Sequence, residues 1–191
     1  MFKVQLNLRK VVAVAICLAG GATIFAQEES AQKETGVKIG ETTWATCNVG
    51  DKGEFVTKPS ESGGRYTWES AQNVCPAGWR LPNVAEIEDL LKNPSQQVTK
   101  DGVLGREFGK TPNTIFLPET GNVNIKTPFS PNGEISKNPN DNNHSRSKFG
   151  YYWSSEKASM GKANYLYFAG KYARRTTYSR TAYLAVRCVA E

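Results

Sequence analysis

The chain has 191 residues, of which 39% are hydrophobic, enough for one domain with a real core and too few for two domains of ordinary size. It has 24 basic and 18 acidic side chains, and three of the basic ones lie within the first 26 residues. Without that segment 21 basic side chains face 18 acidic ones, and this net charge of +3 argues against nucleic acid or an anionic membrane surface as a partner.

The first 26 residues have the layout of a secretory signal. Three basic residues precede an unbroken apolar run over residues 11–18, and small residues follow up to Ala26. We therefore predict a signal peptide over residues 1–26 that is cleaved after Ala26. Because Gly20 and Gly21 interrupt the apolar run, which is shorter than a bilayer requires, we expect no integral membrane span after cleavage.

Cys17 raises the alternative of a bacterial lipoprotein, because lipoproteins carry a cysteine at the end of the apolar region. That processing site needs a small residue just before the cysteine, and here Ile16 stands there. We therefore favour an exported protein of the periplasm, the cell surface or the medium over lipidation at Cys17.

The cysteine count is informative in an exported chain, since such a chain meets an oxidising compartment. Cys47, Cys75 and Cys188 remain after cleavage, so at most one intramolecular disulfide can form and one thiol is left over. The sequence has no CxxC pair, and its single histidine is His144. A structural zinc site needs four closely spaced ligands, so we assign no metal site.

The mature chain begins with a polar stretch, and we predict a flexible tail over residues 27–36 and one domain over residues 37–191. Residues 37–49 are rich in β-branched and aromatic side chains, which predicts one or two short strands. Residues 50–64 are predicted to form a loop.

The stretch TWESAQNVCPAGWRLP, residues 67–82, predicts a short helix and the elbow after it. Thr67 is a plausible N-cap, and Trp68, Ala71 and Cys75 recur at helical spacing to form a narrow apolar stripe. The proline and the glycine that follow Cys75 end this helix.

A second helix is predicted to follow the GWRLP elbow. Asn83 and Glu86 have the spacing of an N-cap with a supporting acid, and Pro94 ends the helix. Its apolar face consists of Val84, Ile87, Leu90 and Leu91. We interpret the tryptophans of the chain as core, and Arg80 and Arg187 as holders of buried or half-buried polar contacts.

The pattern is weak between residues 92 and 148. Phe108 and residues 114–117 are compatible with strand, whereas residues 128–147 are rich in Asn, Pro, Ser and Gly and predict a long surface loop. The later segments FGYYWSS, ANYLYFAG and TAYLAVRCV predict a closing antiparallel sheet.

The densest basic run, residues 171–180, is interleaved with tyrosines. We interpret it as an exposed strand or hairpin whose charges keep a sheet edge soluble. The alternative is a sugar-stacking or polyanion-binding surface made of Tyr172, Arg174, Arg175 and Tyr178.

The order of two short helices, a long loop and a terminal sheet with a cysteine in its last strand resembles the C-type lectin-like fold. The motifs WATCNVG, CPAGWRLP, FLPETG, YYWSS and VRCV, between Val37 and Glu191, look like those of the Fibrobacter succinogenes major paralogous domain. This is a group of exported bacterial proteins, common in Bacteroidota, whose biochemical role is not established. The resemblance implies an α+β fold with two short helices early, a mostly antiparallel β-sheet and long loops. It also implies a disulfide between Cys75 and Cys188, with Cys47 as a buried thiol in an early strand.

The resemblance and the lack of a catalytic constellation favour a non-enzymatic binding or surface-structural domain without a cofactor. No residue identifies its ligand, and the candidate partners are a glycan or a protein at the cell surface. No residue is assigned a catalytic role. Ser154 and Ser155 lack a histidine nearby in the sequence and a GxSxG elbow, so they are not expected to be nucleophiles.

Sugar-binding C-type lectins hold calcium with a proline-containing loop and a Trp-Asn-Asp motif. Asn138, Asn140 and Asp141 resemble the first of these and form a candidate ligand loop, but Trp153-Ser154-Ser155 departs from the second. Calcium prefers several carboxylate or carbonyl oxygens, and Asp141 is the only acid near Asn138. We therefore favour a solvated turn without bound metal.

Two alternatives stay open. Formylglycine-generating enzymes also use a lectin-like scaffold, but their copper needs two nearby cysteines, and this chain has only Cys188 there unless Cys47 folds against it. A fimbrial or other assembly subunit is not separated from a binding domain by the sequence.

Overall fold

The computed structural model describes residues 35–121 and 149–191. The predicted signal peptide lies outside the described residues, and so does the candidate ligand loop with Asn138, Asn140 and Asp141. Among the residues that are described, no helix has the length and hydrophobicity needed to cross a membrane.

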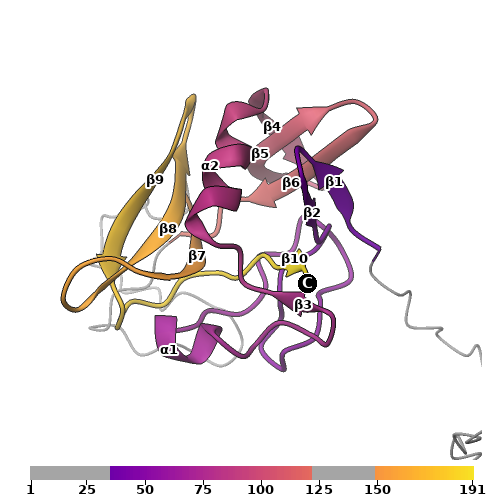
Figure 1. The fold of residues 1–191 in the computed structure, drawn as a ribbon. Helices are drawn as coiled ribbons and strands as arrows, with labels where there is room; N and C mark the ends of the chain where they lie inside the picture. Colours follow the sequence, from indigo (N-terminus) through magenta and orange to yellow (C-terminus); the bar gives the residue numbers. More distant parts are fainter. Residues whose placement is uncertain (1–34, 122–148) are drawn as a thin grey trace, which may run out of the picture. The chain divides into compact units, whose positions relative to one another are not determined.

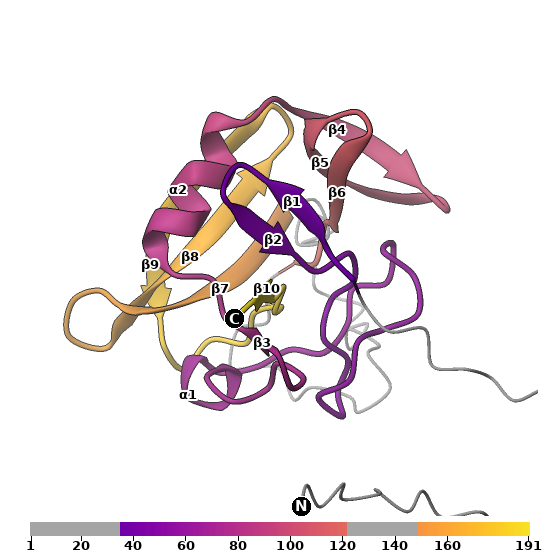
Figure 2. The same ribbon diagram turned by 45° about the vertical axis from the view of Figure 1, so that its right-hand side comes forward.

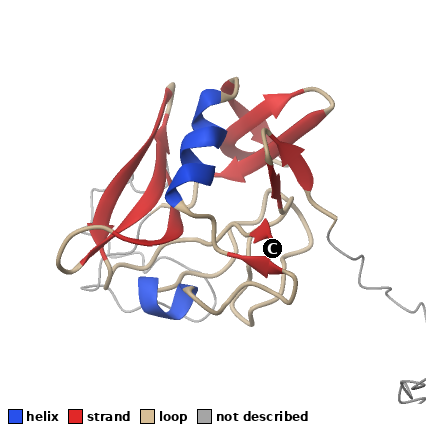
Figure 3. Cartoon of the chain, viewed as in Figure 1, coloured by secondary structure: helices blue, strands red, loops and turns tan. Residues whose placement is uncertain are grey.

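The described part of the chain contains three sheets, whose strand pairs are antiparallel, and two helices (Figures 1 and 3). The first sheet has the order β1-β2-β10-β3, with β1 Val37–Ile39, β2 Thr42–Trp44, β10 Val189–Ala190 and β3 Trp79–Arg80. The second sheet consists of β4 Ser95–Lys100, β5 Val103–Lys110 and β6 Asn113–Pro118. The third consists of β7 Phe149–Lys157, β8 Lys162–Ala169 and β9 Tyr172–Ser179. The predicted early strands and mostly antiparallel sheet are confirmed.

Helix α1, Trp68–Ala71, begins as predicted and ends earlier than predicted. The Thr67 hydroxyl accepts a hydrogen bond from the backbone N–H of Ser70, as an N-cap does. The predicted continuation to Cys75 is wrong. The backbone bonds after the first turn are i→i+3 bonds, from Gln72 to Glu69 and from Val74 to Ala71, both 3.4 Å, and such bonds close a helix end.

Helix α2, Val84–Lys92, has the predicted capping box. The Asn83 side chain accepts from the backbone N–H of Glu86, and the Glu86 carboxylate accepts from the backbone N–H of Asn83, each at 2.8 Å. Ile87 and Leu90 are buried, and the helix packs against β7, β8 and β9 and against β5 (Figures 1 and 2). The helix therefore covers one face of the β7–β9 sheet.

The hairpin of β4 and β5 departs from the sequence expectation, which placed only Phe108 in a strand here. Its turn is formed by Asp101 and Gly102, whose φ angles are +51° and +76°. A two-residue turn with both φ angles positive matches the twist of the flanking strands, and Asp-Gly is a preferred sequence for it. The polar strand β4 is thereby paired with β5 from end to end.

The last predicted strand, TAYLAVRCV, is mostly not a regular strand. Only Val189–Ala190 forms β10, whereas residues 184–188 are buried and bond to several different elements. Leu184 N–H donates to Tyr66 O, Ala185 N–H to Tyr151 O, and Val186 O accepts from Val49. Because the neighbours change from residue to residue, the segment is held in place without a continuous ladder.

The core has two clusters. One lies beneath α2 and includes Trp44, Ile87, Phe108 and Phe168. The other surrounds Trp153 and includes Trp68 of α1, Leu184 and Cys188. The tryptophans at positions 44, 68 and 153 are therefore core residues, as the sequence indicated.

Candidate functional site

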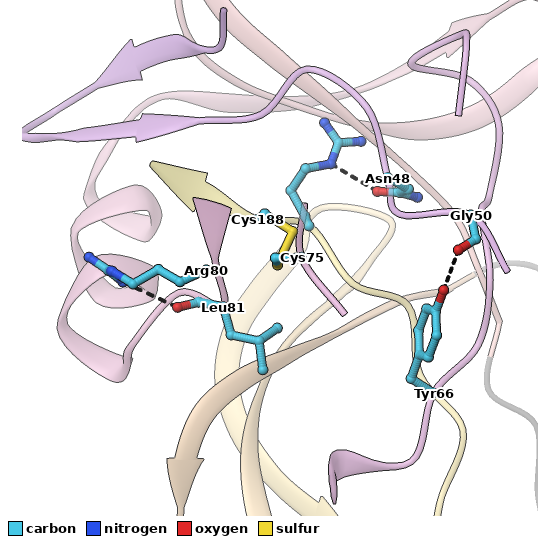
Figure 4. The surroundings of a disulfide bond; sticks show 8 residues. Asn48, Gly50, Tyr66, Cys75, Arg80, Leu81 and Cys188 are labelled. Carbon is cyan, nitrogen blue, oxygen red and sulfur yellow. Dashed lines mark hydrogen bonds between the residues drawn. A yellow bond between two sulfur atoms is a disulfide. The ribbon is translucent and has the colours of Figure 1, made fainter. Parts of the chain in front are cut away.

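The Cys75–Cys188 disulfide ties the segment after α1 to the residue before β10, 113 positions further along the chain (Figure 4). This is the pairing that the family resemblance implied, and it is confirmed. Cys47 is buried and takes no part in the disulfide, but it lies in the bend after β2, so the prediction of a strand position is wrong.

Arg187 is a buried residue next to this disulfide, and its hydrogen bonds connect several segments of the interior. Its side chain is 1% exposed, and its guanidinium donates to the Asn48 side chain at 2.8 Å (Figure 4). It also donates to the backbone carbonyl oxygens of Ala45, Thr46 and Phe116. Asn48 in turn donates to the Tyr152 hydroxyl at 3.4 Å. These contacts join the segment after β2 to strands β6 and β7, so Arg187 is a structural residue, as predicted.

The GWRLP elbow is also scaffold. The Arg80 guanidinium makes a two-pronged contact with Glu86, at 2.8 and 2.7 Å. It also donates to the Leu81 carbonyl oxygen (Figure 4). Burial is the largest single effect on Glu86 and raises its pKa. The hydrogen bonds from Arg80 and from the backbone of Asn83 together outweigh it and hold the pKa of Glu86 below its usual value. The elbow thus fixes the start of α2.

A different surface of the molecule offers groups that the scaffold leaves available. Successive side chains of a strand point to opposite faces of a sheet. The register of β7 on β8 pairs Tyr151 with Tyr167, and the register of β8 on β9 pairs Tyr167 with Arg174. We call the surface that these residues share the aromatic face; it consists of Phe149, Tyr151, Tyr165, Tyr167, Tyr172, Arg174 and Tyr178.

The rings of the aromatic face contact one another. Tyr151 lies at the centre, with its ring centroid 5.8 Å from Tyr165 and 5.4 Å from Tyr167. Phe149 stacks on Tyr167 at 6.0 Å, and Tyr178 meets Tyr165 edge-on at 5.9 Å. Aromatic pairs of this kind stabilise each other and hold the rings in fixed orientations. The face is therefore a preorganised surface.

Burial decreases across the face. Tyr165 is 6% exposed, Tyr151 and Tyr167 are half-buried, and Tyr172 is 66% exposed. Burial, helped by the neighbouring phenols of Tyr167 and Tyr178, raises the pKa of Tyr151 to about 12. Burial likewise raises the pKa of Tyr165. These phenols therefore stay protonated at neutral pH and can donate hydrogen bonds.

The described part of the chain provides no hydrogen-bond partner for the hydroxyls of Tyr151, Tyr165 and Tyr167. The hydroxyl of Tyr152, which points to the other face, donates to the Pro118 carbonyl oxygen at 2.7 Å. The aromatic face thus contains three phenol groups whose hydrogen-bonding capacity the described fold does not use, and of these Tyr165 is buried whereas Tyr151 and Tyr167 are half-buried.

The four residues predicted as an aromatic and basic surface do not all share one face. Tyr172, Arg174 and Tyr178 belong to the aromatic face, but Arg175 points to the opposite side, where its guanidinium donates to Glu88 of α2 at 2.8 Å and to Asn164 at 2.9 Å. The prediction for Arg175 is wrong because neighbours in a strand alternate between faces.

Arg174 has a different environment from Arg175. It is exposed, and its guanidinium lies 5.5 Å from the ring centroid of Tyr167. No carboxylate of the described residues forms an ion pair with it. A guanidinium over an aromatic ring keeps its donors available for a ligand.

Sequence reasoning missed Tyr151, Tyr165 and Tyr167. The signal was present in the alternation of FGYYWSS and ANYLYFAG, where every second residue is aromatic.

The two described residues that flank the gap between the described ranges lie next to each other at one end of the aromatic face. The backbone N–H of Gly121 donates to the carbonyl oxygen of Phe149 at 2.8 Å.

The described residues contain no group of three or more His, Cys, Asp or Glu side chains that could hold a metal ion. The arrangement on the aromatic face instead offers hydrogen-bond donors, ring edges and one positive charge, which are groups for binding.

Comparison with known proteins identifies a family for this chain. No curated protein and no solved structure matches the chain. The family model described as the Fibrobacter succinogenes major domain matches residues 27–190. Since this match covers most of the chain, including both helices and all three sheets, the chain belongs to the Fibrobacter succinogenes major domain family.

Proposed function

We propose that this chain is an exported, non-enzymatic binding domain with a C-type lectin-like fold, and that the aromatic face is its binding surface. The observation that carries the proposal is the set of phenol hydroxyls of Tyr151, Tyr165 and Tyr167 without described partners, beside Arg174 without a carboxylate. The other face of the same sheet is covered by α2.

The chemistry of the face supports binding. Tyrosine and arginine are enriched among the residues that contribute most to recognition, because they offer large contact areas and directed donors. The rings are already held by their neighbours, so a ligand orders few side chains when it binds. Such a surface needs little rearrangement to take a ligand.

The position of the disulfide supports the lectin-like fold. It joins the segment after the first helix to the residue before the last strand, between the two cysteines that the resemblance implied. The β7–β9 sheet lies between these two cysteines in the sequence. The bond also supports export, since disulfides persist in oxidising compartments. The periplasm, the cell surface and the medium all meet this condition.

The copper-oxidase alternative has less support, because its chemistry would use the sulfur of Cys188, which here is bonded to Cys75. An assembly subunit would pair through a strand edge and not through a sheet face. Substitutions on the aromatic face therefore separate an assembly subunit from the binding domain that we propose.

The test is a binding screen with the mature chain from Gln27 on glycan and protein arrays. A double variant, Tyr151→Ala with Tyr167→Ala, is compared with Arg175→Ala, which changes the opposite face of the sheet. We expect ligands that the double variant loses and the Arg175 variant keeps. Ligands that both variants retain, or no ligand on either array, would contradict the proposal.

A further inference from the structure

We infer that the ligand of the aromatic face is an acidic saccharide, whose carboxylate or sulfate binds Arg174 and whose hydroxyls bond to the phenols of Tyr151 and Tyr167. This inference rests on the proposed binding function and specifies its ligand. It follows from three features of the face: its charge, its exposed groups and its place in the sheet.

The charge of the face is positive. None of the residues that β7, β8 and β9 contribute to it is acidic. The acid of these strands, Glu156, is engaged elsewhere, since its carboxylate accepts from the backbone N–H of Val84 at the start of α2, at 3.0 Å. Arg174 is therefore complementary to an anion, and a guanidinium binds a carboxylate or a sulfate with two hydrogen bonds.

A second cation stands beside Arg174 at the same end of the sheet. The Lys171 ammonium lies 5.4 Å from the ring centroid of Tyr172, and no carboxylate of the described chain pairs with it. Lys171 precedes β9, and Tyr172 and Arg174 both belong to the aromatic face. An anionic group bound at Arg174 therefore meets a positive region and no competing acid of these strands.

The exposed groups of the face suit an oxygen-rich ligand. Side chains stand roughly perpendicular to a sheet, so stacked tyrosines present their ring edges and hydroxyls outward. The rings of Tyr151 and Tyr165 are stacked with an inclination of only 18°, but Tyr165 is buried, so the half-buried Tyr151 and Tyr167 are the phenols that a ligand reaches. Each phenol can donate one hydrogen bond and accept others, as the hydroxyls of a saccharide require.

The place of these groups in the sheet argues for a saccharide over an acidic peptide. An extended peptide satisfies its backbone groups by pairing with a strand edge. Tyr165 and Tyr167 belong to β8, which pairs with β7 on one side and β9 on the other. A ligand can reach the phenols of this central strand only from the face of the sheet, because β8 has no free edge. A saccharide suits this position, since its hydroxyls can bond to the phenols without pairing with a strand.

The experiment uses the mature chain and a galacturonic acid hexasaccharide, with its fully methyl-esterified form as the matched neutral probe. Titration calorimetry should show binding of the acid, and binding of the ester weaker by about tenfold or more, the usual loss for a charge-assisted hydrogen bond. A heparin-type hexasaccharide distinguishes sulfate from carboxylate as the preferred anion.

Two adjacent arginines supply the matched variants. Arg174→Ala should lower the affinity for the acid by about tenfold, whereas Arg175→Ala should change this affinity by less than about twofold. Tyr151→Phe removes only the hydroxyl and should lower the affinity for both the acid and the ester. Far-UV circular dichroism and the melting temperature show that each variant is folded.

Equal affinity for acid and ester, or equal effects of the two arginine variants, would overturn the acidic saccharide. If neutral ligands bind, and only the double variant Tyr151→Ala with Tyr167→Ala loses them, the proposed binding surface is supported and the inference of an acidic ligand is wrong. Preference for a hexaglutamate peptide over both saccharides would replace the saccharide with an acidic protein. No binding of the acid, the ester or the sulfated probe would also overturn the inference.

Discussion

The two faces of the β7–β9 sheet can be compared through pairs of neighbouring residues. On β7, Tyr152 bonds to Pro118 and is 2% exposed, whereas Tyr151 is half-buried among other rings. On β9, Arg175 bonds to Glu88, whereas Arg174 lies over the ring of Tyr167. One face has its polar groups bonded within the described fold, and on the other face the hydroxyl of Tyr151 and the guanidinium of Arg174 have no described hydrogen-bond or ion-pair partner.

The comparison teaches that residue type does not separate scaffold from candidate site in this chain. Tyrosine and arginine occur on both faces: the functional groups of Tyr152 and Arg175 are hydrogen-bonded on one side, and those of Tyr151, Tyr167 and Arg174 have no described hydrogen-bond or ion-pair partner on the other. What differs is the neighbouring element: α2 packs on one face and supplies Glu88, whereas the aromatic face packs in part against the second core cluster and otherwise against its own rings.

The largest effect is expected in the scaffold. The double variant Cys75→Ala with Cys188→Ala frees a loop closed by residues 113 apart, for which the chain-entropy model gives about 4 to 5 kcal/mol of lost stability. Urea unfolding of oxidised protein measures this loss. Cys47→Ala is the control and should cost less than about 1.5 kcal/mol, and similar losses for both variants would contradict the structural role of the disulfide.

Adjacent residues of β8 compare the two faces directly. Phe168 is 1% exposed, and its ring lies against the backbone of Gly150, where no side chain would fit. Phe168→Ala should therefore cost about 3 to 5 kcal/mol of unfolding free energy. Tyr167→Ala on the aromatic face should cost less than about 1.5 kcal/mol. Equal losses in chemical denaturation would mean that both faces are core.

A smaller effect is expected at alkaline pH. The pKa of Tyr151 is raised by burial from its ordinary value of 10 to about 12, and that of Tyr152 to about 12, also by burial but against the opposing charge of Arg187. A raised pKa means that the unfolded chain loses its proton first. The stability from these groups is therefore complete below pH 10 and is lost as the pH rises through about 12.

Tyr151→Phe should remove part of this pH dependence. The melting temperature of the variant should fall less between pH 10 and 12 than that of the unchanged chain. Absorbance at the phenolate band follows the titration of the tyrosines in parallel. A variant whose melting temperature falls as steeply as before would show that Tyr151 is not desolvated.

Local signals in the sequence predicted the helix starts. Thr67 and the pair Asn83 and Glu86 are caps whose partners lie within three residues, so their geometry does not depend on the rest of the fold. The length of α1 was overestimated because the stripe of Trp68, Ala71 and Cys75 is also satisfied by one turn followed by a disulfide.

Non-local pairing explains most of what the sequence did not reveal. Strand β4 is polar and lacks alternation, and it is defined by its partner β5, although the Asp101-Gly102 turn was a usable signal. The buried segment before β10 has several different neighbours, which no period in the sequence reports.

The candidate site was predicted in part. The alternation of side chains along a strand places the adjacent Arg174 and Arg175 on opposite faces of the sheet. Applying this period of two to residues 172–178 would have predicted that the two arginines do not share a surface. The array of Tyr151, Tyr165 and Tyr167 needs the register of β7 on β8, which depends on the whole sheet. The disulfide pairing came from the family resemblance, because three cysteines alone allow three pairings.

The most direct test of the account is hydroxyl-radical footprinting of the mature chain with peptide mass analysis, because oxidation follows the solvent access of each ring. The account predicts the strongest oxidation at Tyr172, which is 66% exposed, intermediate oxidation at the half-buried Tyr151 and Tyr167, and protection of Tyr152, which is 2% exposed. If Tyr151 and Tyr167 are protected as fully as Tyr152, the aromatic face is not open to a ligand and the proposed binding surface is wrong.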